Sequence, residues 1–296
     1  DRFGCATQTG QKRKMNKFLI VDGSNLLFQM FFGMPARIVN GVGKPIQGTL
    51  GFVGAFLRMV RMTRPTHAAV IFDGEHGTER NEISSDYKAN RRDFTGLPDA
   101  DSPFSQLDDI CAALDLLGVF RTEAEVYEAD DVIASYAIRL GGSGEYRVVV
   151  ASQDSDLYQL IGENVSVLRY RGKKSTLCDA GYVRERFGVA PERYADLKSL
   201  TGDASDNIRG VRGVGPKTAA ALIARFGSIE ELLAHTDLIT RPALRSAIEE
   251  NTDRIRKNYR LIKLTDRAGL PAAPARIAFD PDSVTTADVL RTIGLT

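Results

Sequence analysis

The 296-residue chain has few cysteines and histidines, three of each, and its charges nearly cancel to a net charge of +1. The widely spaced Cys5, Cys111 and Cys178 indicate free thiols in a reducing compartment rather than a disulfide framework. No apolar run approaches the ~18 residues that a membrane span requires, so we expect no membrane contact. Because a net charge near zero gives no overall basic field, any nucleic-acid binding must depend on how the charges are distributed.

The composition, 43% hydrophobic and 26% charged, is ordinary for a globular protein of one large or two smaller domains. Residues 1–14 are basic and lack apolar periodicity, and Met15 resembles a natural start, so we interpret them as a tag, an alternative start or a disordered tail. We expect an α/β domain over 15–180, a helical region over 181–266 and a C-terminal extension over 267–296.

Aspartates follow the predicted strands of the α/β domain. Three short apolar runs each lead into one: residues 18–22 into Asp22, 67–73 into Asp73 and 147–151 into Asp154. Such β-branched runs, alternating with helical patterns, predict a mostly parallel sheet with helices on both faces. Because ligands bind beyond the carboxyl ends of parallel strands, we expect the three aspartates to share one site.

Further acids extend this set. They are Glu128, Asp130 and Asp131 at the start of a predicted amphipathic helix, Asp156 after the third strand, and Asp203 and Asp206 farther along. Crowded carboxylates must take up protons or bind cations, and oxygen ligands without histidine or cysteine favour Mg²⁺ or Mn²⁺. Two such ions could hydrolyse a phosphodiester. Asp131 is the weakest member, because adjacent helical residues face different ways, and Asp206 is either an N-cap or an outer ligand.

A basic segment lies between two groups of these acids. Its Lys88, Arg91 and Arg92 either clamp a scissile phosphate or form a solvated face. The surrounding residues 80–103 are poorly patterned and predict either a mobile loop or helices that order on binding. Phe31, one helix after the first strand, either packs in the core or stacks on a terminal base.

From residue 182 onward the pattern predicts helices and no further strands. Gly213 and Gly215 allow close approach of a phosphate backbone, and Lys217 and Thr218 stand at the start of the next helix. This pattern predicts a helix–hairpin–helix that holds duplex nucleic acid by its backbone. Before this region, residues 165–177 predict a β-hairpin with a basic tip.

Seven motifs occur in order, and together they resemble the 5′-nuclease (flap endonuclease) superfamily, most of all the 5′→3′ exonuclease domain of bacterial DNA polymerase I and its stand-alone relatives. They are Ile20-Val-Asp-Gly-Ser24, Phe72-Asp-Gly74, Tyr87-Lys-Ala-Asn-Arg91, Glu128-Ala-Asp-Asp131, Ser152-Gln-Asp-Ser-Asp156, Gly202-Asp-Ala-Ser-Asp-Asn207 and Gly210-Val-Arg-Gly-Val-Gly-Pro-Lys217. The resemblance spans roughly residues 16–266.

The resemblance implies a PIN-like domain followed by a helix–three-turn–helix, and Mg²⁺-dependent cleavage of 5′ flaps and 5′ duplex ends. It implies a first metal site at Asp22, Asp73, Glu128 and Asp130, and a second at Asp154, Asp156 and Asp203, with Asp131 and Asp206 in or near these shells. Lys88 and Arg91 would steady the scissile phosphate, and K⁺ would assist the hairpin at Gly213 and Gly215. Phe31 would stand where many relatives carry tyrosine.

We therefore expect a monomeric, stand-alone, structure-specific nuclease that acts on branched or nicked DNA in replication and repair. Its location would be the bacterial cytoplasm, at the nucleoid. Segment 80–103 is short for a full helical arch over a threaded flap. Two other hypotheses remain: a PIN-type RNase, which would lack the helix–hairpin–helix, and a non-catalytic branched-DNA binder whose acids hold structural metal.

Overall fold

The computed structural model describes residues 15–34, 37–74, 79–94, 96–98, 101–282, 289 and 291. The leader expected at residues 1–14 lies outside these described residues, as does part of the C-terminal extension expected over 267–296.

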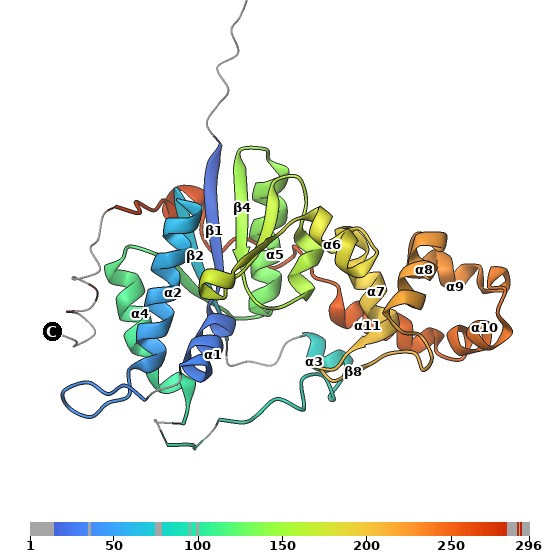
Figure 1. Ribbon diagram of the computed structural model, residues 1–296, viewed down its shortest axis with the longest axis horizontal. Coiled ribbons are helices and arrows are strands. Elements are labelled where there is room, and N and C mark those ends of the chain that lie inside the picture. The colour runs from blue at the N-terminus through green and yellow to red at the C-terminus, as the bar shows by residue number, and fades with distance from the viewer. Residues whose placement is uncertain are drawn as a thin grey trace, which may run out of the picture.

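A six-stranded sheet forms the centre of the N-terminal part of the chain (Figure 1). Its strands are β1 (Asn16–Asp22), β2 (His67–Asp73), β3 (Phe120–Ala124), β4 (Tyr146–Ala151), β5 (Val165–Arg169) and β6 (Thr176–Cys178). They lie in the order β3-β2-β1-β4-β5-β6, and only β6 pairs antiparallel with its neighbour. The predicted mostly parallel sheet is confirmed.

The register of the three central strands brings their carboxyl ends together. Asp22 of β1 lies opposite Ile71 of β2, and Val21 lies opposite Ala151 of β4. Asp73 and Asp154 therefore follow at the same edge of the sheet, which is where the sequence predicts a shared site.

Helices cover both faces of the sheet (Figure 1). Alternate side chains of β1 enter two different cores, so that Phe18 and Ile20 pack on one face while Leu19 and Val21 pack on the other. The helices of the second face are α1 (Gly23–Gly33), α2 (Gln47–Thr63) and α4 (Leu107–Leu116). Those of the first face are α5 (Ala129–Gly142) and α6 (Ala180–Phe187).

The C-terminal part is helical and lies beside the sheet domain (Figure 1). Its helices are α7 (Tyr194–Thr201), α8 (Pro216–Phe226), α9 (Ile229–Ala234), α10 (Pro242–Glu249) and α11 (Thr252–Ile262). Short 3-10 helices complete the chain: η1 (Pro103–Gln106), η2 (Asp156–Leu160), η3 (Gly172–Lys174), η4 (Pro191–Arg193), η5 (Thr236–Leu238) and η6 (Pro274–Ile277).

One expectation for the C-terminal part is wrong, because two short strands interrupt its helices. Strands β7 (Gly202–Asp203) and β8 (Ile208–Arg209) form an antiparallel pair between α7 and α8. A Cβ atom on Gly202 would lie 2.4 Å from the Gly210 nitrogen, so the backbone approach here requires glycine. Two residues per strand are too few to give a periodic pattern.

Three further elements differ from the sequence prediction. Strand β3 was not predicted. The apolar pattern of residues 50–64 predicts a helix, and α2 begins three residues earlier; the pattern of residues 104–117 also predicts a helix, which begins as the 3-10 turn η1. Within the described part of segment 80–103, the structure has the short helix α3 (Glu79–Ile83) followed by turns rather than a longer helix.

Residues after α11 return across the sheet domain. The Tyr136 hydroxyl donates to the Ala272 carbonyl (3.0 Å) and accepts from the Ala272 amide (2.9 Å). The Phe279 amide donates to the Thr66 carbonyl (2.9 Å), and its ring packs in the core with α2. This return fastens the helical part to the sheet domain.

Candidate metal centre and nucleic-acid interface

Acids at the carboxyl edge of the sheet form the centre of the site. Asp22 is buried; it caps α1 by accepting from the Asn25 amide (2.9 Å), and it accepts from the Ser152 hydroxyl (2.8 Å). Asp73 at the end of β2 accepts from the Ala129 amide at the start of α5 (3.0 Å). These local hydrogen bonds fix the two carboxylates beside the first turn of α5.

Four of the acids lack a neutralising cation at hydrogen-bond distance. Burial, and then the charge of Asp73, raises the pKa of Asp22 to about 7. Burial and the charge of Asp154 raise the pKa of Asp156 to about 8. Loss of hydration, together with neighbouring carboxylates, also raises the pKa of Asp130 and of Asp154. Their mutual repulsion shows that they gather in one place.

Two other acids are neutralised by lysines. Glu128 accepts from Lys88 Nζ (2.9 Å), and Asp203 accepts from Lys198 and from the Ser205 amide (2.9 Å). Burial alone would raise the pKa of each carboxyl, but the lysine contacts outweigh it and hold both pKa values below their usual range. Lys198 also stands 3.6 Å from Asp156, which places it beside the proposed ligands of the second metal.

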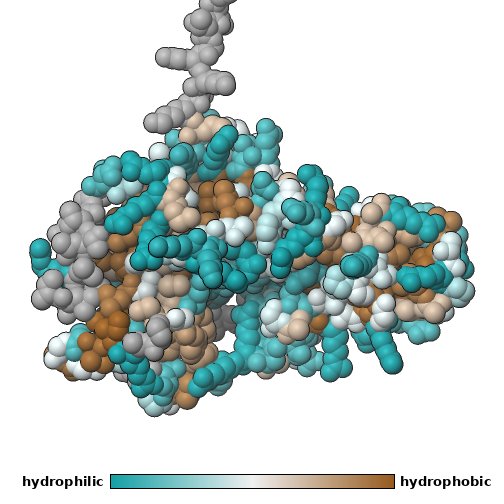
Figure 2. Space-filling view, viewed as in Figure 1, coloured by the Kyte–Doolittle hydropathy of each residue, from teal (hydrophilic) through white to brown (hydrophobic). Residues whose placement is uncertain are grey.

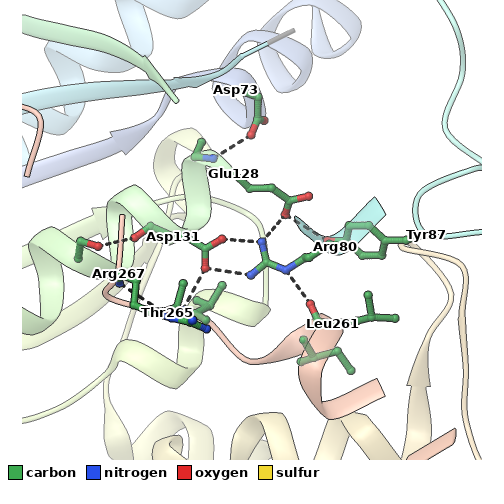
Figure 3. Close-up of polar contacts among 12 residues, drawn as sticks. Asp73, Arg80, Tyr87, Glu128, Asp131, Leu261, Thr265 and Arg267 are labelled. Carbon is green, nitrogen blue, oxygen red and sulfur yellow. Dashed lines mark hydrogen bonds and ion pairs between the residues drawn. The ribbon is translucent and has the colours of Figure 1, made fainter. Parts of the chain in front are cut away.

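Asp131 points toward the Arg80 guanidinium, which lies between it and Glu128 (Figure 3). Its two oxygens accept from the Arg80 guanidinium (2.6 and 2.9 Å), and one of them also accepts from the Thr265 amide (3.0 Å). Because Asp130 and Asp131 are adjacent on α5, they point to different sides of the helix. The expectation that Asp131 lies in or near a metal shell therefore gives way to a structural ion pair.

The basic segment lies directly beside the acids. Lys88 contacts Glu128, and Arg91 donates to Asp206 Oδ1 (2.9 Å), so both candidate phosphate clamps rest on carboxylates. Asp206 is buried and is held by Arg91 rather than capping a helix. Arg92 is exposed, and its guanidinium stacks over the Phe94 ring at 5.3 Å.

The predicted hairpin is present between β8 and α8. Gly213 has a φ of +83°, which favours glycine, and the Val214 amide closes the turn on the Val211 carbonyl (3.0 Å). Helix α8 then begins with Gly215 as its N-cap and Pro216 in its first turn, as the sequence predicts. Lys217 is exposed there and Thr218 is half-buried.

The structure places Phe31 in the core, which is the first of the two roles considered for it. Its ring is 7% exposed, whereas the next ring, Phe32, is 54% exposed. Phe32 belongs to an aromatic patch on the surface, whose other members are Phe28, Phe94 and Phe104 with ring centroids 5.4–6.2 Å apart. Base stacking by Phe31 would require that its ring leave the core.

The donor chemistry of the cluster fits divalent cations. All its candidate ligands are carboxylate oxygens, and Asp156 Oδ1 is buried without a hydrogen-bond partner. Within the described ranges, no three acidic, histidine or cysteine side chains form a ready-made metal site. Two of the candidate ligands, Glu128 and Asp203, turn instead toward lysines.

Three contributors to the site had no clear signal in the sequence. Arg80 and Tyr87 contact acids that are 41–51 positions away in the sequence, and Lys198 reaches Asp203 from α7. Tyr87 donates to Glu128 Oε2 (3.1 Å) from within a motif that we noted only for its basic residues.

Hydrophilic side chains gather over the junction between the two parts of the molecule (Figure 2).

No helix in the described ranges is long and apolar enough to cross a membrane.

A T5 bacteriophage flap endonuclease, solved as a pseudo-enzyme-product complex with DNA and metal ions, has the same fold. It aligns with a TM-score of 0.68 at 24% identity, covering 94% of this chain and 99% of that one.

Two curated relatives are similar in sequence. The thermostable DNA polymerase I of Thermus aquaticus is 35% identical over 255 residues, which are 86% of this chain but 29% of the polymerase. The chain therefore spans less than a third of that relative's length. A protein of Aquifex aeolicus named 5′-3′ exonuclease is 34% identical over 255 residues, covering 84% of this chain and 82% of that protein.

Two family models together match most of the chain. Residues 17–188 match the N-terminal resolvase-like domain of 5′-3′ exonucleases, and residues 189–284 match their C-terminal SAM fold. With the likeness to the Aquifex protein along most of both chains, these matches show that the chain belongs to the 5′-3′ exonuclease family.

Proposed function

We propose that the chain is a structure-specific 5′ nuclease that hydrolyses DNA phosphodiesters with the help of divalent cations. The observation that carries the proposal is the cluster of uncompensated acids at the sheet edge, directly beside Lys88 and Arg91. Its substrates would be branched or nicked duplexes with a 5′ flap or 5′ end, in replication and repair. In this proposal the nuclease domain ends at residue 180 and the DNA-binding region begins at residue 181.

We propose two Mg²⁺ ions as the cofactors, with Mn²⁺ able to replace them. Bound cations would supply Lewis-acid activation of water and would neutralise charge on the leaving oxygen. The first site would use Asp22, Asp73, Glu128 and Asp130, and the second would use Asp154, Asp156 and Asp203, with Asp206 farther out. Asp156 Oδ1, which lacks a hydrogen bond, supports this assignment.

Lys88 and Arg91 would hold the scissile phosphate. Each now rests on a carboxylate, Glu128 or Asp206, so that a phosphate oxygen would replace one anionic partner with another. Their charges would stabilise the additional negative charge of the transition state. This exchange would remove one of the contacts that hold Glu128 Oε2, while those from Arg80 and Tyr87 would remain.

The hairpin at Gly213 and Gly215 would hold the duplex by its phosphates, with K⁺ as a further ligand there. Exposed backbone at these glycines and the positive end of α8, next to Lys217 and Thr218, favour an anion. This contact carries no base information, so the enzyme would recognise DNA structure rather than sequence. A monomer would suffice, because one chain supplies both parts.

Unpaired bases of a flap would meet the aromatic patch instead of Phe31. The exposed rings of Phe32 and Phe104 offer flat surfaces for stacking, and Arg92 adds a cation beside Phe94. The patch begins on α1, the helix that starts at Asp22. A strand that leaves the acid cluster along α1 would therefore pass these rings.

The proposal is tested by incubating the protein with a 5′-labelled flap duplex, with Mg²⁺, with Mn²⁺ or with EDTA. We expect cutting near the flap junction that requires the metal and is lost in Asp154→Ala. Asp115→Ala is the matched control, since Asp115 is an exposed partner of Arg121 remote from the cluster, and it should cut like wild type.

Three other outcomes would contradict the proposal in different ways. Binding of the flap duplex without cutting in either metal would favour a non-catalytic DNA binder. Cutting of an RNA strand in preference to the DNA flap would favour an RNase. Cutting that persists in Asp154→Ala would refute the proposed metal site while leaving the nuclease assignment intact.

A further inference from the structure

The basic segment is docked onto the β7–β8 turn through a set of reciprocal hydrogen bonds. The Lys88 amide donates to the Asp206 carbonyl (3.1 Å), and the Asn90 side-chain amide donates to the Ala204 carbonyl (3.1 Å). In the opposite direction, Asn207 Nδ2 donates to the Asp86 carbonyl (2.8 Å). The contact joins two segments that are more than 110 residues apart in the sequence.

The backbone at this contact is in a rare conformation on both sides. Three non-glycine residues in the described ranges have a positive φ, and two of them, Lys88 (57°) and Asn207 (58°), meet here. Asparagine adopts this conformation readily, but lysine does not. A strained residue persists only where its surroundings hold it, so the conformation of Lys88 depends on the contacts made by its neighbours.

The side of the contact that carries β7 and β8 is firmly joined to the hairpin. Gly202 and Gly210 approach so closely that neither can carry a Cβ atom, and the Val211 amide donates to the Leu200 carbonyl (2.8 Å). Tyr87, the neighbour of Lys88, packs with Ile208 of β8 in a small buried cluster. The segment that carries Lys88 is therefore packed against residues that are continuous with the hairpin.

We propose that Asn207 is a positioning residue, which holds the Lys88–Arg91 segment on the β7–β8 turn and so couples the duplex-binding hairpin to the phosphate clamp. The inference rests on the proposed function, because it assigns Lys88 and Arg91 to the scissile phosphate. The simpler alternative is that Asn207 is present only because a turn at φ 58° favours asparagine.

Glycine separates these two explanations. Asn207→Gly keeps the backbone conformation without strain but removes the amide that donates to Asp86. If Asn207 serves only the turn, this variant should behave like wild type. If its side chain positions the segment, we expect the single-turnover rate of flap cutting to fall roughly 10- to 100-fold, because small misplacements of a clamp are costly.

Two further measurements distinguish positioning from loss of binding or of folding. We expect the Kd for the flap duplex in EDTA to stay within about two-fold of wild type, since the hairpin contacts the duplex without the segment. Limited trypsin digestion without DNA should cut after Lys88, Arg91 and Arg92 several-fold faster in Asn207→Gly, because cleavage follows local opening of the backbone.

Asn90→Ala tests the same contact from the other segment. It replaces Asn207→Gly as the test of the proposal if Asn207→Gly has a much lower melting temperature than wild type. Asn164→Ala is the matched control, since it removes a side-chain amide bond to the Gly141 carbonyl (3.1 Å) away from the site. Wild-type rates and trypsin protection in both Asn207→Gly and Asn90→Ala would overturn the proposal. An inactive wild type whose trypsin protection still depends on Asn207 would refute the proposed function and leave the docking intact.

Discussion

Apart from Asp73, the acids of the site fall into two groups that differ in how their charge is balanced. Asp22, Asp130 and Asp154 sit at the sheet edge with raised pKa values and no cation at hydrogen-bond distance, and Asp156 is only approached by Lys198 at 3.6 Å. The paired acids contact a lysine or arginine: they are Glu128, Asp131, Asp203 and Asp206.

The two groups teach different lessons about the role of a buried carboxylate. The unpaired group sits on the rigid ends of β1 and β4 and the start of α5, where repulsion is tolerable only if protons or metal ions arrive. The paired group joins separate elements of the chain, because its partners come from residues 80–91 and from α7. Neutralised acids thus connect the elements around the site, and the unpaired acids are the members of the proposed metal sites that have no cation of their own.

The largest effect should come from breaking the most buried pair. Arg80→Met would leave Asp131 and Glu128 without the guanidinium that now donates to both, and all three side chains are less than 10% exposed. We expect the free energy of unfolding to fall by about 3–5 kcal/mol, because a buried charge that loses its partner is strongly destabilising. Chemical denaturation measures this change.

Arg121→Met is the matched control for Arg80→Met. It also removes an arginine that makes two bonds to an aspartate, but the pair with Asp115 is largely exposed. Its effect should remain below about 1 kcal/mol. Equal losses in the free energy of unfolding of the two variants would mean that burial of the ion pair does not determine how much it contributes to stability.

The second effect is a pH dependence that belongs to the unpaired group. The folded-state pKa values of Asp22 and Asp156, about 7 and 8, lie above the value of about 3.8 expected in the unfolded chain. Folding is therefore favoured while they bind protons, and this stability is lost as the pH rises through about 7–8. His67 works weakly against this trend, because burial lowers its pKa.

We expect the metal-free protein to lose on the order of 5 kcal/mol of stability between pH 5 and pH 8, which thermal melts in EDTA would detect. Glu128 and Asp203 do not obscure the trend, since their lowered pKa values act only below about pH 4. Saturating Mg²⁺ should flatten the profile, because cations replace the protons. A metal-free stability that rises from pH 5 to pH 8 would contradict the assignment of the unpaired group.

A third, smaller effect contrasts one member of each group. At pH 8 in EDTA, Asp154→Asn should raise the free energy of unfolding by about 1 kcal/mol, because it removes one of several repelling charges. Glu128→Gln should lower it by a similar amount, since it weakens contacts with Lys88 and Arg80. Both variants should lose flap cutting in Mg²⁺. If Asp154→Asn and Glu128→Gln changed the free energy of unfolding in the same direction, the distinction between unpaired and paired acids would be wrong.

The same division explains what could be predicted from the sequence. Asp22 and Asp73 were placed correctly because apolar β-branched runs fix where a strand ends, and the ends of parallel strands meet. Strand β3 was missed because it lies at the edge of the sheet and alternates, as Phe120-Arg-Thr-Glu-Ala124, between half-buried and exposed residues. Nothing in such a run separates it from a loop.

The pairing of acids could not be predicted, because the partners are distant in the sequence. Arg80 reaches Asp131 across 51 positions, and no local spacing marks that contact. Helix α1 posed a different difficulty, since Phe28, Phe31 and Phe32 stand at i, i+3 and i+4 and therefore share one face of it. Periodicity could not decide which ring enters the core, and tertiary packing selected Phe31.

The smallest stability effect should come from the exposed end of the paired group. Arg91 also pairs with a buried aspartate, Asp206, but its own side chain is 52% exposed. Arg91→Ala should therefore cost less than about 1 kcal/mol of stability, because water can replace much of the lost contact. If Arg91 clamps the scissile phosphate, its single-turnover rate should nevertheless fall on the order of 10²-fold.

Arg92→Ala is the control for Arg91→Ala, since the neighbouring Arg92 is exposed and stacks on Phe94 without contacting an acid of the cluster. It should weaken flap binding modestly and leave the rate at saturating enzyme close to wild type. A loss of stability in Arg91→Ala comparable to that in Arg80→Met would show that Arg91 is a structural partner of Asp206. A large loss of rate with unchanged stability would instead show that Arg91 acts on the substrate. Asp206 would then hold the Arg91 guanidinium only until a phosphate takes the place of the carboxylate.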